Sequence, residues 1–162
     1  MFTAMEPIVV TPPVGTTLSA MLAAAELQVA ERHIFEHYLK RCRQEPSAPG
    51  PRDVYCPRLI ERASTPELLL AARKHGRTAG TFFDYVAFLL FSWQGWLRHW
   101  REQDTYPGSV LCLDPVFDYE SLWLYPAAVP NGDTGSCTLY FVRDNDSWVW
   151  TPGTTVLLTD LR

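Results

Sequence analysis

Short motifs for catalysis or metal binding are scarce in this chain. Its four cysteines form no CxxC pair, and no histidine spacing completes a zinc-finger pattern, which argues against a structural zinc site. There is no glycine-rich phosphate loop and no GxSxG nucleophile elbow, so P-loop nucleotide hydrolysis and α/β-hydrolase chemistry are disfavoured. The sequence therefore predicts no cofactor, and it favours a function without catalysis.

Signals for secretion or membrane insertion are also lacking. No basic segment and no long apolar run open the chain, and Pro12 and Pro13 stand in tandem there, so a signal peptide is not predicted. Unpaired cysteines then favour a reducing cytoplasm, although a leader removed from a longer precursor is an open alternative. The most apolar stretch is bracketed by Asp84 and Gln94 and followed by Arg98, which argues against a membrane span.

Positive charge is limited as well. The net charge is −4 and the sequence pI is about 5.5, so nonspecific nucleic-acid binding, which needs a basic surface, is disfavoured. Residues 1–80 hold 10 Lys and Arg against 8 Asp and Glu, whereas residues 81–162 hold 4 against 10. The acidic excess is either solubilising loop charge or a face for a basic partner. It comprises Asp114, Asp118, Glu120, Asp133, Asp144, Asp146 and Asp160.

Apolar and aromatic residues are abundant by contrast. Hydrophobic residues make up 47% of the chain and aromatic residues 13%, which predicts a globular domain with a thick core or a lined cavity. Residues 1–15 are rich in Pro and Thr and predict a flexible arm. Residues 16–162 predict a single α+β domain, because a chain of this length fits one core.

Helical periodicity dominates the first two thirds of the chain and predicts three helices. The first should run over residues 18–43, capped by Thr16 or Thr17, because a hydroxyl there can accept an orphan backbone N–H. The third should run over residues 82–103. Its apolar surface extends almost all round, so it is either central to the fold or part of an interface.

The second predicted helix is marked at both ends. Thr65 should cap it, with Pro66 at the first helical position and Glu67 beside the positive end of the helix dipole. Gly76 should end it, since glycine readily adopts the left-handed backbone that follows many helices.

A strand-like period follows Pro107 and Gly108. Strands are predicted over residues 110–113, 122–125, 137–143, 148–150 and 155–159, with an antiparallel hairpin turning at 144–147. Together, the elements predict an α+β fold in which three N-terminal helices pack on a C-terminal, curved, mostly antiparallel sheet.

The C-terminal segment resembles the closing hairpin of the NTF2-like superfamily. In that superfamily, as over Thr138–Arg143 and Trp148–Trp150 here, a hydrophobic strand, an acidic turn and a Trp-bearing strand follow one another. The resemblance implies a cone-shaped α+β fold, in which a curved sheet wraps a helix and leaves a pocket. The chain departs from that pattern in its long third helix and in lacking a clear early strand at Val54–Cys56. A generic helical layer on an antiparallel sheet is the alternative.

His33, Glu36 and His37 match the H-x-x-E-H pattern of inverted zinc peptidases. The two histidines lie one helical turn apart, so both could face a metal ion, with Glu36 as general base. The match is short, however, and the same helix needs a polar face that these residues supply. A structural role is therefore favoured, and no metal site is predicted.

Asp84 is a second candidate for acid–base chemistry, in addition to His37. Its neighbours Phe82, Phe83 and Tyr85 are apolar or aromatic, and apolar surroundings generally tune a carboxyl toward proton transfer. The simpler interpretation is that an Asp near a helix start accepts free backbone N–H groups and interacts with the dipole.

Aromatic residues could line a ligand cavity or fill the core. The candidates are Tyr38, Tyr85, Trp93, Trp96, Trp123, Trp148 and Trp150. If they fill the core, the protein is a non-catalytic binding protein, for example a bacterial immunity or secretion-associated protein, that acts through its acidic, aromatic sheet half. If they line a cavity, it is an NTF2-like small-molecule binder or enzyme. We expect a protein partner, which should be basic if it binds the acidic face. Whether two copies of the chain pair is an open alternative.

Overall fold

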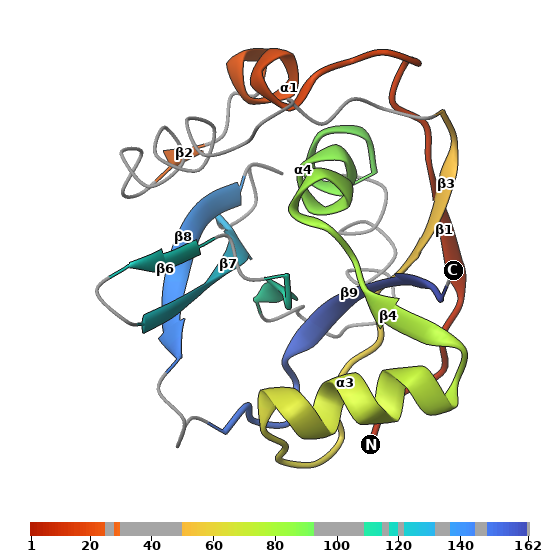
Figure 1. Cartoon of the computed structure of the whole chain (residues 1–162), viewed down its shortest axis with the longest axis vertical. Coiled ribbons are helices and arrows are strands. Elements are labelled where there is room, and N and C mark those ends of the chain that lie inside the picture. Colours follow the sequence, from red (N-terminus) through yellow and green to blue (C-terminus); the bar gives the residue numbers. More distant parts are fainter. Residues whose placement is uncertain are drawn as a thin grey trace.

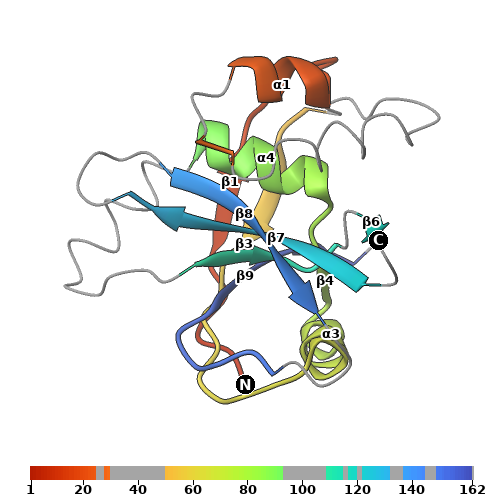
Figure 2. The ribbon, with the colours of Figure 1, turned by 90° about the vertical axis from the view of Figure 1, so that its left-hand side faces the viewer.

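A mixed β-sheet with helices on both faces forms the framework of the chain (Figure 1, Figure 2). Helices α1 (Leu18–Ala24) and α4 (Phe82–Phe91) lie on one face, and α3 (Thr65–Lys74) lies on the other. No helix in the described part of the chain is long and apolar enough to cross a membrane. The computed structural model describes residues 1–24, 28–29, 50–92, 109–114, 117–119, 122–131, 137–144 and 149–161.

The sheet contains nine described strands in the order β1-β3-β9-β5-β7-β8-β2, with β4 paired to β9 and β6 paired to β7. The pairs β5–β9 and β2–β8 are parallel, and the other pairs are antiparallel. The prediction of a mostly antiparallel sheet is thus confirmed, although the sheet is only loosely curved. The strands are β1 (Pro7–Val10), β2 (Gln28–Val29), β3 (Arg52–Tyr55), β4 (Arg77–Ala79), β5 (Val110–Cys112), β6 (Phe117–Tyr119), β7 (Leu122–Pro130), β8 (Cys137–Asp144) and β9 (Thr155–Asp160).

Strand β9 is the centre of the sheet. It pairs with β3 on one side, while β5 and then β4 follow one another along its other side. Gly80 lies where β4 ends, and its N–H donates to the Leu157 carbonyl at 3.1 Å. A Cβ at position 80 would overlap Leu157 Cδ2. A side chain at position 80 would therefore require the Leu157 side chain to shift, and glycine avoids this overlap.

Two clusters of buried side chains follow from the alternation of residues along the strands. Phe82 and Phe88 of α4 pack with Leu139 of β8 on one face. Leu68 of α3 and Trp150 pack on the other face. Because α4 packs both on the sheet and against Leu18 and Met21 of α1, it is buried along most of its length, as its nearly continuous apolar sequence predicts.

The end signals of α3 are confirmed with a shift of one residue. Ser64, rather than Thr65, is the N-cap, and both its N–H and its Oγ–H donate to Glu67 Oε2 at 2.8 Å. Gly76 has φ +69°, the left-handed conformation that ends a helix. Thr65 is instead the first helical residue, where its side chain is available for a tertiary contact.

The first predicted helix is correct at its start and wrong in its length. Thr17 Oγ1 accepts the N–H of Ala20 at 3.2 Å, which confirms the threonine cap of α1. The helix ends at Ala24, and β2 then pairs in parallel with β8. Backbone pairing with a distant strand thus overrides local helix propensity. Residues 30–49 lie outside the described part of the chain.

Strands also occur where the sequence indicated none. Residues 7–10, placed above in a flexible arm, form β1 and pair with β3 from Pro7↔Tyr55 to Val10↔Arg52. Strands β3 and β4 contain only four and three residues, too few to show a period. The helices therefore do not form an N-terminal block, because β1 to β4 lie between and before them.

The C-terminal strand predictions are largely confirmed by β5, β7, β8 and β9. Strand β7 continues through Pro126, which lies opposite Phe141 and between the stretches of β7 that pair with β6 and with β5. Proline is tolerated there because, among the described strands, only β8 pairs with β7 at this position. Trp150 pairs with Ala63 instead of returning along β8. Helix α4 ends at Phe91, and residues 93–108 lie outside the described part.

Candidate functional site

The first residues of α4 hold the carboxylate that the sequence analysis singled out. Thr81 Oγ1 accepts the Asp84 N–H at 3.1 Å, while the N–H and Oγ–H of Thr81 donate to Asp84 Oδ2 at 3.0 and 2.7 Å. This reciprocal arrangement is a capping box. The capping interpretation of Asp84 is therefore confirmed.

The second oxygen of Asp84 faces a cation from the neighbouring layer. Arg52 Nη1 of β3 lies 2.6 Å from Asp84 Oδ1, and the two side chains are 21% and 1% exposed. The two opposite charges attract each other strongly at this short separation, because both side chains are largely shielded from water. Both carboxylate oxygens are thus engaged in holding α4 to its own first turn and to β3.

A second carboxylate supports the same helix end. Asp114 Oδ2 accepts the Phe82 N–H at 3.0 Å. Burial raises the pKa of Asp114, the hydrogen bond from Phe82 lowers it, and the nearby Asp84 charge raises it further. Two acids at a helix N-terminus match the helix dipole, so the contacts of Asp84 and Asp114 given above are explained by the stabilisation of the start of α4.

Tyr85 belongs to the core, and it lines neither of the two hollows that the described residues form. Its side chain is fully buried, and its hydroxyl donates to the Val110 carbonyl at 2.7 Å. Burial raises the pKa of Tyr85 well above its ordinary value. On the face of the sheet that α4 covers, Phe82, Tyr85 and Phe88 fill the space against the strands.

An open apolar depression lies on the opposite face, and we call it the sheet hollow. It has a volume of about 190 Å³. Leu111, Ala127 and Tyr140 form a row across β5, β7 and β8, because Leu111 pairs with Ala127 and Ala127 with Tyr140. The full lining is Ser109, Leu111, Ala127, Tyr140, Val142, Val149, Trp150, Thr151 and Thr154.

Trp150 forms a fixed wall of the sheet hollow. Its Nε1–H donates to Thr65 Oγ1 at 2.9 Å, and its ring meets that of Tyr125 edge-on, with centroids 6.2 Å apart. A buried Trp needs such a donor partner. Val149 beside it is 46% exposed. The hollow therefore combines a rigid aromatic wall with an accessible apolar rim.

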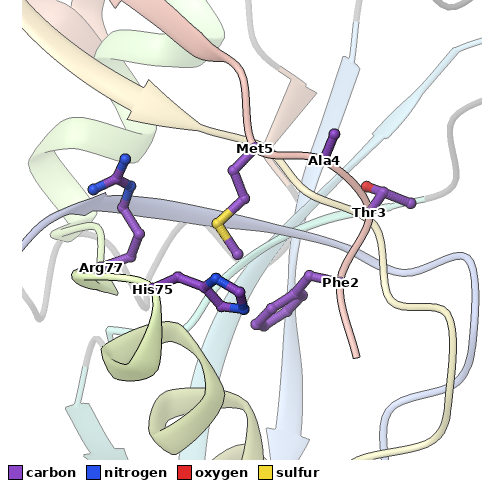
Figure 3. Close-up of a pocket in the computed structure, with 6 residues that line it drawn as sticks. All are labelled: Phe2, Thr3, Ala4, Met5, His75 and Arg77. Carbon is purple, nitrogen blue, oxygen red and sulfur yellow. The ribbon is translucent and has the colours of Figure 1, made fainter.

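A second depression, the N-terminal hollow, lies between residues 2–5 and the junction of α3 and β4 (Figure 3). Its volume is about 350 Å³. Figure 3 shows the side chains of Phe2, Met5 and His75 turned toward one another, with Arg77 on the far side of His75 from Phe2. The lining is Phe2, Thr3, Ala4, Met5, His75 and Arg77.

Arg77 is held firmly at the edge of this hollow. Its Nη1 lies 2.8 Å from Asp160 Oδ1 and also donates to the Gly76 carbonyl at 3.3 Å. The guanidinium carbon stands 4.0 Å above the centre of the Tyr55 ring, a cation–π geometry. Of the acidic residues in the second half, the structure thus assigns Asp160 to Arg77 and Asp114 to α4.

Most other predicted site residues lie outside the described part of the chain. Of the candidates, Asp84, Tyr85 and Trp150 are described in full, and only Trp150 lines a hollow. For Trp123 the structure describes only the backbone, within β7. Those outside the described part are His33, His37, Tyr38, Trp93, Trp96 and Trp148.

The described cysteines are buried free thiols. Burial raises the pKa of Cys137 to about 12, and it also raises the pKa of Cys56 and of Cys112. Such thiols are poor nucleophiles and poor metal ligands. Among the described residues there is no group of three or more His, Cys, Asp and Glu side chains that could hold a metal ion.

Several lining residues were not identified from the sequence. Tyr140 and Val142 alternate with buried residues along β8, and this signal marks a half-buried strand face but not a depression. His75 was expected only as part of a helix end. Phe2 and Met5 gave no signal, because residues 2–5 oppose the α3–β4 junction only in the folded chain.

No family model, curated protein or solved structure matches this chain. Its function is therefore argued from the geometry of the two hollows and of the groups around them.

Proposed function

We propose that the protein binds another protein without catalysis, and that the sheet hollow receives an apolar anchoring side chain of that partner. The size of the hollow carries this proposal. Small-molecule pockets usually enclose about 300–1,000 Å³, whereas the sheet hollow encloses about 190 Å³. That volume suits one large apolar side chain better than a complete ligand.

The lining supports the same reading. Protein interfaces are enriched in aromatic residues, and their binding energy concentrates where a side chain enters a well-packed pocket. Trp150 and Tyr140 supply the aromatic walls, and Val142 and Val149 supply the aliphatic rim. Trp150 is held in place by Thr65 and Tyr125, so little ordering entropy remains to be lost on binding.

The partner's surface around the anchor should be basic. Strand β8 ends at Asp144, two residues beyond Val142 of the hollow. Residues 81–162 carry 10 acidic residues against 4 basic residues. Opposite charge on the partner would steer the encounter and fix its orientation.

A matched pair of surface variants tests the proposal. Val149→Glu places a charge on the rim of the sheet hollow, while Leu70→Glu places one on the outer side of α3, where Leu70 is 58% exposed. Partners are captured from a native lysate on immobilised wild-type protein, and the affinity of each is then measured by titration calorimetry.

We expect Val149→Glu to weaken a hollow-directed partner at least tenfold, about 1.4 kcal/mol, and Leu70→Glu to leave it unchanged. Raised salt should slow association if the partner is basic. Equal affinity for Val149→Glu and the wild type would show that the hollow is not the binding surface. Both variants should unfold at similar temperatures, which separates binding from stability.

A further inference from the structure

The N-terminal hollow has walls of two chemical kinds. Phe2, Ala4 and Met5 make one wall apolar, and Thr3, His75 and Arg77 supply the polar groups. At about 350 Å³, the hollow falls at the lower end of small-molecule pockets. With about 30 Å³ for each water-sized atom, it has room for roughly a dozen non-hydrogen atoms.

The polar groups of this hollow can all donate hydrogen bonds. Thr3 Oγ1 already accepts the Arg58 N–H at 2.9 Å, which leaves its own O–H to donate. The guanidinium of Arg77 has donors only, and a histidine ring can donate from at least one nitrogen. No carboxylate is among the lining residues. The absence of a carboxylate and the presence of a guanidinium therefore favour a ligand whose polar end accepts hydrogen bonds.

The preference for an acceptor does not depend on net charge alone. Asp160 offsets part of the Arg77 charge at 2.8 Å, and Arg77 Nε is buried out of a ligand's reach. His75, by contrast, is exposed, and Figure 3 shows its ring next to the side chains of Met5 and Phe2. His75 is therefore the main hydrogen-bond donor for a ligand. Arg77 contributes the part of its positive charge that Asp160 does not offset.

The framework of the hollow is fixed before any ligand arrives. The Thr3 N–H donates to the Arg58 carbonyl at 2.9 Å, and β1 begins at Pro7 opposite Tyr55. On the other side, His75 is the C-cap of α3, with its N–H bonded to the Ala72 carbonyl at 2.9 Å. Preformed walls reduce the cost of ordering on binding.

We propose that the N-terminal hollow binds a small carboxylic acid with an apolar body, the carboxylate accepting from His75 and the body lying against Phe2 and Met5. This site is separate from the sheet hollow, and it stands or falls independently of protein binding.

Methyl NMR of methionine tests this proposal in the whole chain. The chain has three methionines: Met5 lines the hollow, whereas Met21, on the buried side of α1, is 1% exposed and serves as an internal control. The probes are 3-phenylpropanoate, 3-phenylpropan-1-ol and 3-phenylpropylamine, which share one apolar body and differ in the head group.

We expect 3-phenylpropanoate to shift the Met5 methyl signal saturably, with a Kd on the order of 1 mM for a ligand of this size. The alcohol should bind several-fold more weakly, the amine should not bind, and the Met21 signal should stay in place. His75→Leu, which keeps bulk and removes the donor, should weaken the acid at least threefold. Lys74→Ala, which removes a neighbouring cation outside the lining, should leave its affinity unchanged.

Three results would overturn the proposal. One is no Met5 shift up to about ten times the expected Kd. Another is equal affinity for the acid, the alcohol and the amine, since the donor wall would then select nothing. The third is an equal shift of Met5 and Met21, which would mark nonspecific binding.

Discussion

Replacing Asp84 with Asn separates the two interactions of this buried side chain. The substitution preserves shape and leaves an oxygen that can accept the Thr81 N–H, so the helix cap is retained. It removes the negative charge that faces Arg52 Nη1 at 2.6 Å. The loss should therefore report the ion pair between α4 and β3, reduced by relief of the repulsion between the Asp84 charge and Asp114.

The magnitude follows from the burial of the two partners. Interactions with a charged group contribute about 1.5–3 kcal/mol, and breaking a fully buried pair costs about 3–5 kcal/mol. Arg52 is 21% exposed and keeps part of its hydration, so we expect Asp84→Asn to cost about 2–3 kcal/mol. Asp84→Ala also removes the cap and should cost about 1 kcal/mol more.

Urea unfolding at pH 7 measures both losses, provided that the dependence on denaturant is unchanged. For a chain of this length, the Asp84→Asn loss corresponds to a fall in melting temperature of about 5–10 °C. Arg52→Met and the double variant complete a thermodynamic cycle whose coupling energy isolates the pair. A loss below about 0.5 kcal/mol, or a coupling energy near zero, would refute the assigned role of the ion pair.

Two further predictions concern the backbone and the titrating acids. Gly80→Ala should cost about 1–3 kcal/mol by overpacking against Leu157, and denaturant unfolding should show a smaller loss in a Leu157→Val background; an equal loss would contradict the clash. The raised pKa of Asp114 implies that its stabilising contribution is present at low pH and declines as pH rises through the folded-state pKa. The free energy of unfolding of Asp114→Asn should therefore increase relative to that of the wild type as the pH rises from 3 to 7. Hydrogen bonds from Ser64 lower the pKa of Glu67, so the free energy of unfolding of Glu67→Gln should decrease relative to that of the wild type as the pH rises from 3 to 7. If the stabilities of the two variants changed with pH in parallel, these assignments would be contradicted.

The sequence determined those features that depend on residues close together in the chain. A capping box joins residues three apart, so the start of α4 at Thr81 and Asp84 was predictable. The start of α3 was predictable to within one residue, and its end was marked by Gly76. The alternation along β8 likewise indicated its strand from the sequence.

Only the tertiary structure decided which distant groups meet. Strands β3 and β4 are too short to show a period and form because β9 offers hydrogen-bond partners to both. The same holds for β1, which pairs with β3 although it lies within residues 1–15, a segment rich in Pro and Thr. Local propensity is weak compared with such pairing, so the sequence did not reveal β1 to β4. For that reason the helices were expected to form an N-terminal block, and this prediction is wrong.

The candidate sites show the same division. The sequence offered Trp150 as a candidate either to line a cavity or to fill the core, and Asp84 as a possible acid, because residue type and local spacing suffice for such proposals. It could not assign Arg52 to Asp84, Thr65 to Trp150 or residues 2–5 to His75, because these contacts join segments far apart in the chain. Residue types thus set which chemistry the chain can offer, and the packing of the sheet against its helices decided which groups are used for structure and which remain open to a ligand or a partner.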